Sequence, residues 1–343
     1  MDSKPVITKE TKNKIRVDYE GKLSFKERMM KKIKASNTWI TAIVNFFKFI
    51  LMLGISYVIL YPFFAKFAQS FMTEADVIDV TVSLIPKHFT LDIYKTIFVE
   101  NHYLEAFINT LILSLLCAII QTFIACLIGY GLAKFKFKGN AIVMGVVILT
   151  MIIPHHILKN SMSMLFFNFD LFHVQSWNYQ GPIEAIFGEP LMLGNSFWPL
   201  TILSVCGLAF KNGLYIYLMR QFFKGVPDEL EESAYVDGSG VFRTFFQIII
   251  PLSVPMMITI FLFTFSWQWT DEFYTKLFFV GRNAIHLMPG VAASPDSFDS
   301  LVNDYRIVAR NTGGMMVIAP LIVLYLFCQR YLVQGIERSG LVG

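Results

Sequence analysis

The chain contains few charged residues: Asp, Glu, Lys and Arg make up 16% of its 343 residues, whereas soluble domains usually approach a quarter. Hydrophobic residues make up 55%, and the mean hydropathy is +0.54. This composition excludes a single water-soluble core. The length accommodates about six membrane-crossing helices of ~20 residues each with their loops. The sequence therefore predicts an all-α protein that crosses a membrane several times.

Cysteine is scarce as well, and all 4 cysteines lie within apolar runs. No CxxC pair and no metal-ligand spacing is present, so small buried thiols are the favoured interpretation and no metal site is predicted. The HExxH, GxSxG and Walker-type glycine motifs of common enzymes are also missing. The sequence thus predicts that the chain is not an enzyme, binds no cofactor and cannot hydrolyse ATP by itself.

Positive charge is concentrated before the first apolar run. The basic residues there are Lys4, Lys9, Lys12, Lys14, Arg16, Lys22, Lys26, Arg28, Lys31, Lys32 and Lys34. A nucleic-acid surface is one interpretation of this run. A cytoplasmic tail over residues 1–42 that meets anionic lipid headgroups explains it better, and no nucleic-acid partner is predicted. The segment is too long and too polar for the basic region of a signal peptide.

The apolar runs predict six membrane spans. They cover residues 43–64, 106–133, 141–158, 197–223, 251–269 and 313–333. Three lysines in the short loop after the second span place that loop inside the cell, which also places both termini inside, including a C-terminal tail at 334–343. The loop 159–196 then lies outside, and its part from Gly181 to Gly194 is predicted to form turns rather than helix.

Polar residues interrupt the fourth span at Lys211-Asn212-Gly213. A lysine in the middle of a span is costly, so this one should face protein, water or a broken backbone. Lys211 and Asn212 are therefore candidates for lining a substrate path. Aromatic and acidic residues at the end of the fifth span are further candidates, although an aromatic belt and a helix cap explain them equally well. They are Trp267, Gln268, Trp269, Asp271 and Glu272.

Residues 224–250, named the coupling segment from here on, form a polar island between two apolar runs. Pro227 suits the first turn of a helix, and the acidic residues after it favour the positive end of the helix dipole. Gly238 can end the helix in a left-handed conformation. A second short helix, 241–249, then leads to Pro251, which is predicted to start the next span. A helix on the membrane surface with no partner is the alternative interpretation.

The adjacent histidines His155 and His156 end the third span, after Pro154. They could bind a metal or a proton. Neighbouring positions on a helix point in different directions, so polar residues at the membrane surface are favoured over a joint site.

Several stretches resemble the MalG-type permease subunits of carbohydrate-uptake ABC transporters, in the binding-protein-dependent permease superfamily. The resemblance covers about residues 43–343 and includes the spacing of the family's EAA coupling motif, at Glu232-Ser233-Ala234 and Gly238. Ser233 stands where the family usually has alanine. The other stretches are 109–111, 129–135, 218–232, 267–273, where Gln268 replaces the usual Asn, and the ending 331–336.

The resemblance implies the MetI-like fold of type I ABC importers, in the plasma (inner) membrane of a prokaryote. It implies that the coupling segment and Gln334-Gly335 contact a cytoplasmic ATPase that binds ATP and Mg. The residues expected at that contact are Glu229, Leu230, Glu231, Glu232, Ser233, Ala234, Asp237, Gly238, Pro251, Gln334 and Gly335. Further implied partners are a second, MalF-like permease subunit, two ATP-binding subunits and an extracellular sugar-binding protein.

The function implied is transport of an oligosaccharide by alternating access. Three alternatives stay open: an ABC permease for another solute, an intramembrane enzyme, and a membrane scaffold that docks a partner without transport. The enzyme is disfavoured because no paired nucleophile and base is apparent in the sequence.

Overall fold

The computed structural model describes the backbone of residues 7–10, 16–19, 36–170, 181–281 and 284–340, and the side chains within 39–170, 181–281 and 284–331. The chain divides into two compact units, Met1–Ala65 and Lys66–Gly343. Each is described here by itself.

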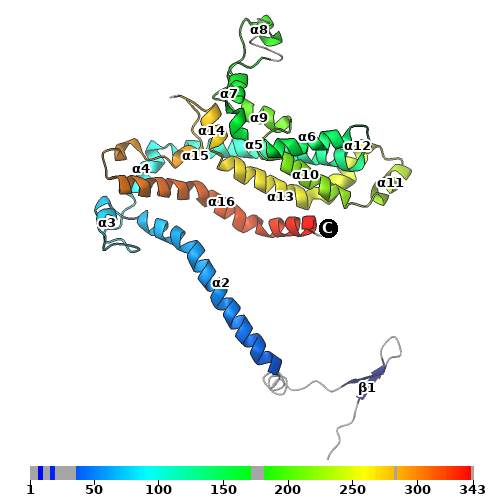
Figure 1. Ribbon diagram of the computed structural model, residues 1–343, viewed down its shortest axis with the longest axis horizontal. Helices are drawn as coiled ribbons and strands as arrows, with labels where there is room; N and C mark the ends of the chain where they lie inside the picture. Colours follow the sequence, from blue (N-terminus) through cyan, green and yellow to red (C-terminus); the bar gives the residue numbers. More distant parts are fainter. Residues whose placement is uncertain (1–6, 11–15, 20–35, 171–180, 282–283, 341–343) are drawn as a thin grey trace, which may run out of the picture. The chain divides into compact units, whose positions relative to one another are not determined.

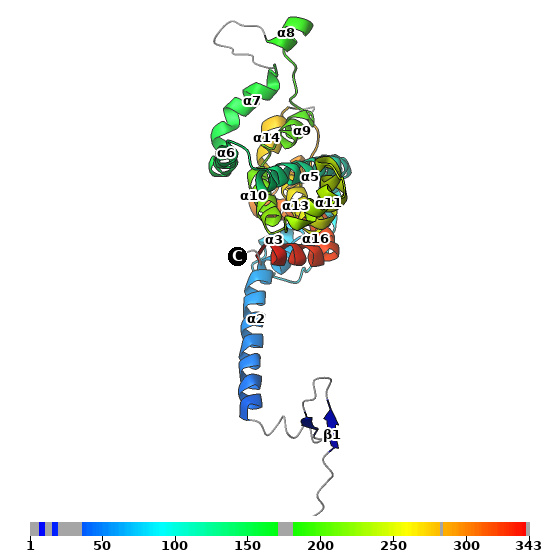
Figure 2. The same cartoon turned by 90° about the vertical axis from the view of Figure 1, so that its right-hand side faces the viewer.

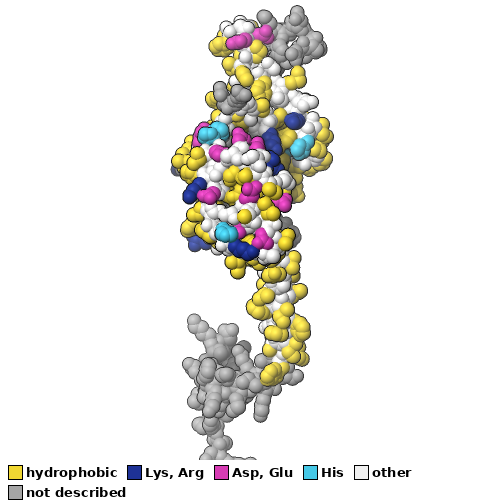
Figure 3. All heavy atoms as spheres, turned by 90° about the vertical axis from the view of Figure 1, so that its left-hand side faces the viewer, with side chains coloured by type: hydrophobic (Ala, Val, Ile, Leu, Met, Phe, Trp, Pro, Cys, Tyr) yellow, Lys and Arg dark blue, Asp and Glu magenta, His cyan; other side chains and the backbone are white. Residues whose placement is uncertain are grey.

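The first unit holds a hairpin and most of a long helix. Strands β1 (Ile7–Glu10) and β2 (Arg16–Tyr19) pair antiparallel, with Ile7 opposite Tyr19. The hairpin was not predicted, because four-residue strands are too short to show a clear alternation. Helix α2 (Ser36–Gln69) contains the predicted first span. Its described large apolar side chains within this unit are exposed, and Figure 3 shows those on one face in yellow. A helix that is apolar all round requires lipid or a partner around it.

The second unit is a helical bundle (Figure 1). Its long helices are α5 (Tyr103–Lys134), α13 (Ile250–Trp269) and α16 (Asn303–Gly340), accompanied by α6 (Asn140–Ile152) and α10 (Asn212–Lys224). Helix α5 packs along both α10 and α13. Gly129 permits this approach, because a Cβ there would lie 2.6 Å from the Cβ of Met219. On the other side, the indole nitrogen of Trp269 donates a 2.9 Å hydrogen bond to the carbonyl of Val317 and joins α13 to α16.

Two of the six predicted spans are not single straight helices. After α6 the chain bends by 88°, with a short 3₁₀ helix (His155–Leu158) before α7 (Lys159–Phe167). Proline at position 154 has no N–H to continue the α6 ladder. In the fourth span, α9 (Trp198–Val205) is only 8 residues long, and α10 begins only at Asn212. Within the described residues, four helices are long and apolar enough to cross a membrane, or up to five if the bent pair counts as one.

The loops between the long helices contain short helices of their own. They are α3 (Glu74–Ile78), α4 (Asp92–Glu100), α8 (Pro182–Phe187), α14 (Phe273–Phe278), α15 (Met288–Val291) and a 3₁₀ turn (Asp296–Phe298). The prediction of turns alone after Gly181 is therefore wrong at α8, which lies outside the bundle (Figure 2). The Asp170 carboxylate explains it: its two oxygens accept the N–H groups of Ile183 and Glu184 at 2.9 Å and stabilise the first turn.

The coupling segment contains α11 (Glu229–Val236) and α12 (Val241–Thr244). A π-helical turn, Phe245–Ile249, follows α12 and continues directly into α13. The fifth span therefore does not start at Pro251, which lies inside a helix running from Val241 to Trp269. In the wide turn the N–H of Ile250 bonds to the carbonyl of Phe245, so the hydrogen-bond pattern changes just before the proline, which has no N–H to offer.

Candidate functional site

Helix α11 ends in a specific backbone arrangement. Gly238 has a φ of +80°, the left-handed conformation that was predicted for it. The N–H of Ser239 bonds to the carbonyl of Ala234 at 2.9 Å, and the N–H of Gly238 bonds to that of Tyr235 at 3.0 Å. These two bonds are those of a Schellman cap. They end α11 sharply and turn the chain into α12, which forms a helical elbow.

The inner face of α11 is held to the last turn of α5. The ammonium of Lys134 lies 2.5 Å from an oxygen of Asp228 and 3.8 Å from one of Glu231, and it also donates to the carbonyl of Val226 at 2.6 Å. The hydroxyl of Tyr130 donates to Glu231 at 3.3 Å. The four side chains Tyr130, Lys134, Asp228 and Glu231 are named the α5–α11 clip. It fixes the start of α11 to a membrane-crossing helix.

Burial and charge act on the two carboxyl groups of the clip in opposite directions. Glu231 is buried, and this burial raises its pKa above the ordinary value, although the Lys134 ammonium and the Tyr130 hydroxyl act against the shift. The hydrogen bond and the charge of Lys134 lower the pKa of Asp228, which is exposed. Lys134 therefore serves two carboxyl groups, and its own side chain is only 6% exposed.

The opposite face of α11 is available for a partner. Two apolar side chains stand out there, since Val236 is 87% exposed and Phe242, on α12, is 78% exposed. Of the residues predicted to contact an ATPase, several are exposed on this segment: Glu229, Leu230, Glu232, Ser233, Asp237 and Gly238. Ala234 and Glu231 are not, because they are buried against the rest of the chain. The two residues are three apart and so share the inner face of α11, and their expected contact with a partner stays a prediction.

The remaining residues predicted at this contact lie elsewhere. Pro251 is exposed within the helix that follows the coupling segment. Gln334 and Gly335 belong to the backbone of α16, but their side chains lie outside the described residues. Val236 was not among the predictions, although a valine between polar residues on a predicted exposed helix is a signal that could have identified it.

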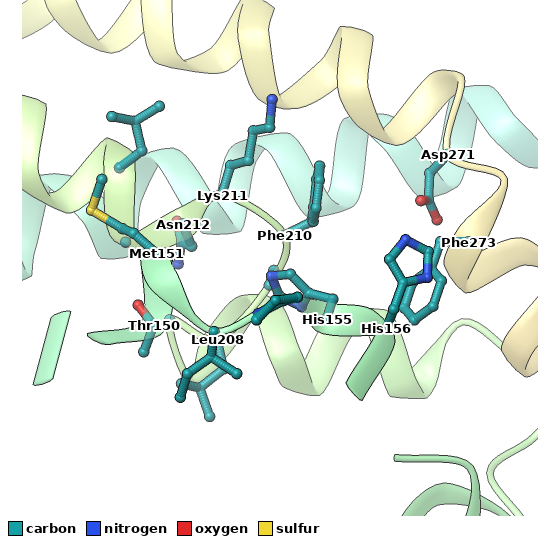
Figure 4. A pocket seen from close by; sticks show the side chains of 16 residues that line it. Thr150, Met151, His155, His156, Leu208, Phe210, Lys211, Asn212, Asp271 and Phe273 are labelled. Carbon is teal, nitrogen blue, oxygen red and sulfur yellow. The ribbon is translucent and has the colours of Figure 1, made fainter. Parts of the chain in front are cut away.

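A cavity of about 500 Å³ lies where the two broken spans meet (Figure 4). Its wall combines the end of α6, the 3₁₀ turn after it, the break between α9 and α10, and the start of the segment after α13. Gly207 and Lys211 take left-handed conformations in the break, with φ of +72° and +61°. The interrupted helices thus provide the hollow, and Figure 4 shows Lys211 extending from it toward the α13 ribbon.

Lys211 and its aromatic neighbours form one side of this site. The Lys211 ammonium lies 3.2 Å from the centre of the Trp267 ring and 5.4 Å from that of Phe210, as expected for a cation–π contact. Trp267 and Gln268 line a smaller hollow next to the cavity, which shares Phe210 and Asp271 with it. The fold thus brings five of the residues predicted to line a substrate path into one region: Lys211, Asn212, Trp267, Gln268 and Asp271.

Asn212 is the most unusual polar residue in the cavity wall. It is fully buried, and neither atom of its amide has a hydrogen-bond partner within the described residues. Figure 4 shows it beside Met151, on the cavity side of α10. A buried amide without a partner is costly, which sets Asn212 apart from the other polar residues of the cavity wall.

The histidines at the bend also line the cavity. The Nδ1 of His155 lies 2.8 Å from the hydroxyl of Tyr274, and the ring of His156 meets that of Phe273 edge-on, with centres 4.7 Å apart. From the sequence, the two histidines were predicted to be polar residues at the membrane surface that do not form a site together. The bend that follows α6 brings both side chains to one wall, a consequence of tertiary structure that neighbouring positions in a sequence do not reveal.

Asp271 caps α14. Its carboxylate accepts the N–H of Tyr274 at 3.0 Å, and burial raises its pKa to about 6 in spite of hydrogen bonds from the backbone. Two other candidates for the path are placed away from the cavity. Trp269 is buried in the core between α13 and α16, and Glu272 is exposed and pairs with Lys276. These two residues do not line the cavity, and their place on a substrate path stays a prediction.

Comparison with known proteins identifies relatives over most of the chain. Residues 121–338 match the family described as binding-protein-dependent transport system inner membrane component. The galactooligosaccharides transport system permease protein GanQ of Bacillus subtilis (strain 168) is 27% identical over 305 residues, covering 87% of this chain and 95% of GanQ. The maltodextrin transport system permease protein MalD of Streptococcus pneumoniae (strain ATCC BAA-255 / R6) is 28% identical, covering 85% of this chain and 93% of MalD.

Solved structures share the fold. A chain of a bacterial ABC transporter involved in the import of the acidic polysaccharide alginate superposes with a TM-score of 0.64 at 20% identity, covering 87% of this chain and 98% of that one. A chain of a bacterial alginate transporter in complex with an alginate pentasaccharide-bound periplasmic protein gives a TM-score of 0.57 at 17% identity, covering 89% and 98%. These likenesses confirm the helical membrane architecture.

Proposed function

Because this chain belongs to the family of binding-protein-dependent transport system inner membrane components, we propose that it is a permease subunit of an ATP-driven ABC importer for an oligosaccharide. The α11–α12 elbow carries this proposal. It has an exposed face with apolar and acidic side chains, and an inner face that the clip holds to α5. A segment of this kind can bind a soluble ATPase on one side and pass its movement to the membrane helices on the other. Relatives named for galactooligosaccharide and maltodextrin transport support the choice of an oligosaccharide.

In the proposed complex, other subunits or lipid cover the exposed surfaces of this chain. The coupling segment docks on one of a pair of ATP-binding subunits, which bind ATP and Mg and hydrolyse the nucleotide. A second, MalF-like permease subunit and lipid cover the exposed apolar helices. An extracellular sugar-binding protein delivers the substrate to the other end of the bundle. The lysines at 134, 136 and 138, next to the coupling segment, support a cytoplasmic location for that segment and for both termini.

The transport step is alternating access. Closure of the ATP-binding subunits moves α11, the clip passes the movement to α5, and the bundle changes between inward-facing and outward-facing states. Since ATP and sugar bind to different chains, their linkage is allosteric and is expressed as a coupling free energy between the two sites.

We assign the sugar-contacting surface of this subunit to the cavity at the broken spans. Aromatic rings there offer flat apolar faces to a sugar, and Asn212 and Lys211 offer hydrogen-bond donors. The cavity is about 500 Å³ in volume, within the range of small-molecule sites, which is roughly 300–1,000 Å³. It is formed only because two spans are interrupted, a feature typical of substrate sites in membrane transporters.

The first test is to purify the chain from its native host in mild detergent and to identify the proteins that accompany it by mass spectrometry. We expect an ATPase, a second permease and a sugar-binding protein. The variant Glu232→Lys, which reverses a charge on the exposed face of α11, should lose the ATPase and keep the second permease. Recovery of the chain alone, from a preparation that keeps other complexes intact, would contradict the proposal and favour a scaffold.

A further inference from the structure

A cluster of two histidines and one glutamate lies at the end of the bundle opposite to the coupling segment. His102, Glu105 and His286 each offer a ligand atom, and these atoms all lie within 4.8 Å of one another. His102 and Glu105 sit at the start of α5, whereas His286 comes from the segment between α14 and α15. Figure 3 shows histidine, acidic and basic side chains gathered on this end of the unit.

The two imidazole rings already face one another. Their centres are 4.3 Å apart and their planes differ by 26°. The Nδ1 of His102 lies 4.0 Å from a carboxylate oxygen of Glu105. His102 takes a left-handed backbone conformation, with a φ of +49°, which is uncommon for a residue that has a Cβ. This conformation turns the chain between α4 and α5 immediately before Glu105.

The backbone that carries His286 is tied to α5 at the histidine itself and two residues after it. The amide of Asn109 donates to the carbonyl of His286 at 3.2 Å, and the N–H of Met288 donates to the Thr110 hydroxyl at 2.8 Å. Asn101 adds two bonds of 2.9 Å, to the carbonyls of Val291 and Ala293. The backbone positions of the cluster are therefore set before any ligand arrives, a requirement for a usable metal site.

We propose that His102, Glu105 and His286 form a zinc-binding site. Two imidazoles and one carboxylate are a donor set that suits Zn²⁺, with a fourth position left for water. In a tetrahedral zinc site the ligand atoms lie about 3.4 Å apart, so the present atoms, which are within 4.8 Å of one another, must approach by up to about 1.4 Å. His102 and Glu105 can make this adjustment, because both side chains are 54% exposed.

Zinc at this position would add a crosslink between the start of α5 and the segment 284–293. The sequence predicted no metal site, because the donors come from positions 102, 105 and 286 and show no motif. The proposal concerns a second site, distinct from the coupling segment and from the cavity. It does not depend on the transported solute.

The test is a zinc titration of the full chain, purified with its accompanying subunits through a tag that contains no histidine. A competing chelating dye reports the free zinc. We expect one zinc ion per chain with micromolar affinity, and His286→Ala and Glu105→Gln should each weaken binding by at least about tenfold. The matched control is His88→Ala, which removes an exposed histidine with a single carboxylate partner, Asp76 at 2.8 Å, and should leave the affinity unchanged.

A second measurement keeps the test independent of how well each variant folds. Zinc should slow amide hydrogen exchange within residues 284–293 in the parent chain and not in His286→Ala. Equal zinc affinity in the parent and in the double variant His102→Ala/His286→Ala would overturn the proposal. So would an equal loss of affinity in His88→Ala.

Discussion

The ammonium of Lys134 lies 2.5 Å from the carboxylate of Asp228 and joins the last turn of α5 to the residue that precedes α11. The two residues are separated by 94 positions. Lys134 also approaches the buried Glu231, so its removal would leave an acidic group without its cation in the interior. A buried carboxylate that loses its charged partner is strongly destabilising.

Lys134→Ala should therefore loosen α11 from α5 and weaken the linkage between ATP hydrolysis and transport. We expect the stimulation of ATPase activity by sugar-loaded binding protein to fall by about tenfold, while the chain remains in the membrane. The measurement is the ATPase rate of the purified complex with and without loaded binding protein. Lys138→Ala is the control, since Lys138 lies in the same loop and is exposed. Equal effects of the two variants would indicate a general role of loop charge rather than the clip.

A second prediction concerns the cap of α11. Gly238 and Gly240 both have open space where a Cβ would stand, but only Gly238 has a positive φ. Gly238→Ala should therefore destabilise the elbow by about 1–2 kcal/mol through backbone strain alone, whereas Gly240→Ala should be neutral or slightly stabilising. Thermal unfolding of the complex and its coupled ATPase activity measure the difference. If both variants behave alike, the left-handed cap has no part in coupling.

The long helices could be predicted from the sequence because their apolar runs are longer than any soluble element requires. The runs at 106–133 and 251–269 lie within the described helices. The interruption at Lys211 was also predictable, since a lysine in an apolar run is a local signal. The cap at Gly238 was also predictable from a local signal, because only a glycine adopts the left-handed conformation at low cost.

Contacts between distant segments could not be predicted in this way. The α5–α11 clip joins residues about 100 positions apart, as Tyr130 and Glu231 show with a separation of 101. The position of Trp269 away from the cavity has the same origin. Its position two residues after Trp267 suggested a shared role. Residues two apart on a helix point to different sides, and the Trp269 indole is directed to Val317 instead.

A third prediction addresses the cavity. Trp267→Ala removes the ring under the Lys211 ammonium and the aromatic face proposed for the sugar. Uptake should fall by about tenfold, with the ATPase and the second permease still recovered alongside the chain. Trp198→Ala is the matched control, because Trp198 is 60% exposed and does not line the cavity. Normal uptake in Trp267→Ala would place the sugar path elsewhere.

The last prediction is a pH dependence that originates from Asp271. Its pKa is raised to about 6 by burial, while an unfolded chain gives aspartate a pKa of about 3.9. Below about pH 4 the group is protonated in both states, so its contribution to stability is complete. The unfolded state loses the proton from about pH 4 upward while the folded state keeps it, so the contribution declines and is lost once the pH has risen through about 6.

Asp271→Asn has no such proton to lose. The variant should therefore have a higher unfolding temperature than the parent at pH 7.5, and the advantage should shrink at pH 5. Thermal unfolding of the purified complex at the two pH values measures this trend. Asp304→Asn, at an exposed position, serves as the control and should show the same offset at both pH values. If the difference in unfolding temperature between Asp271→Asn and the parent does not change with pH, burial does not raise the pKa of this carboxyl group.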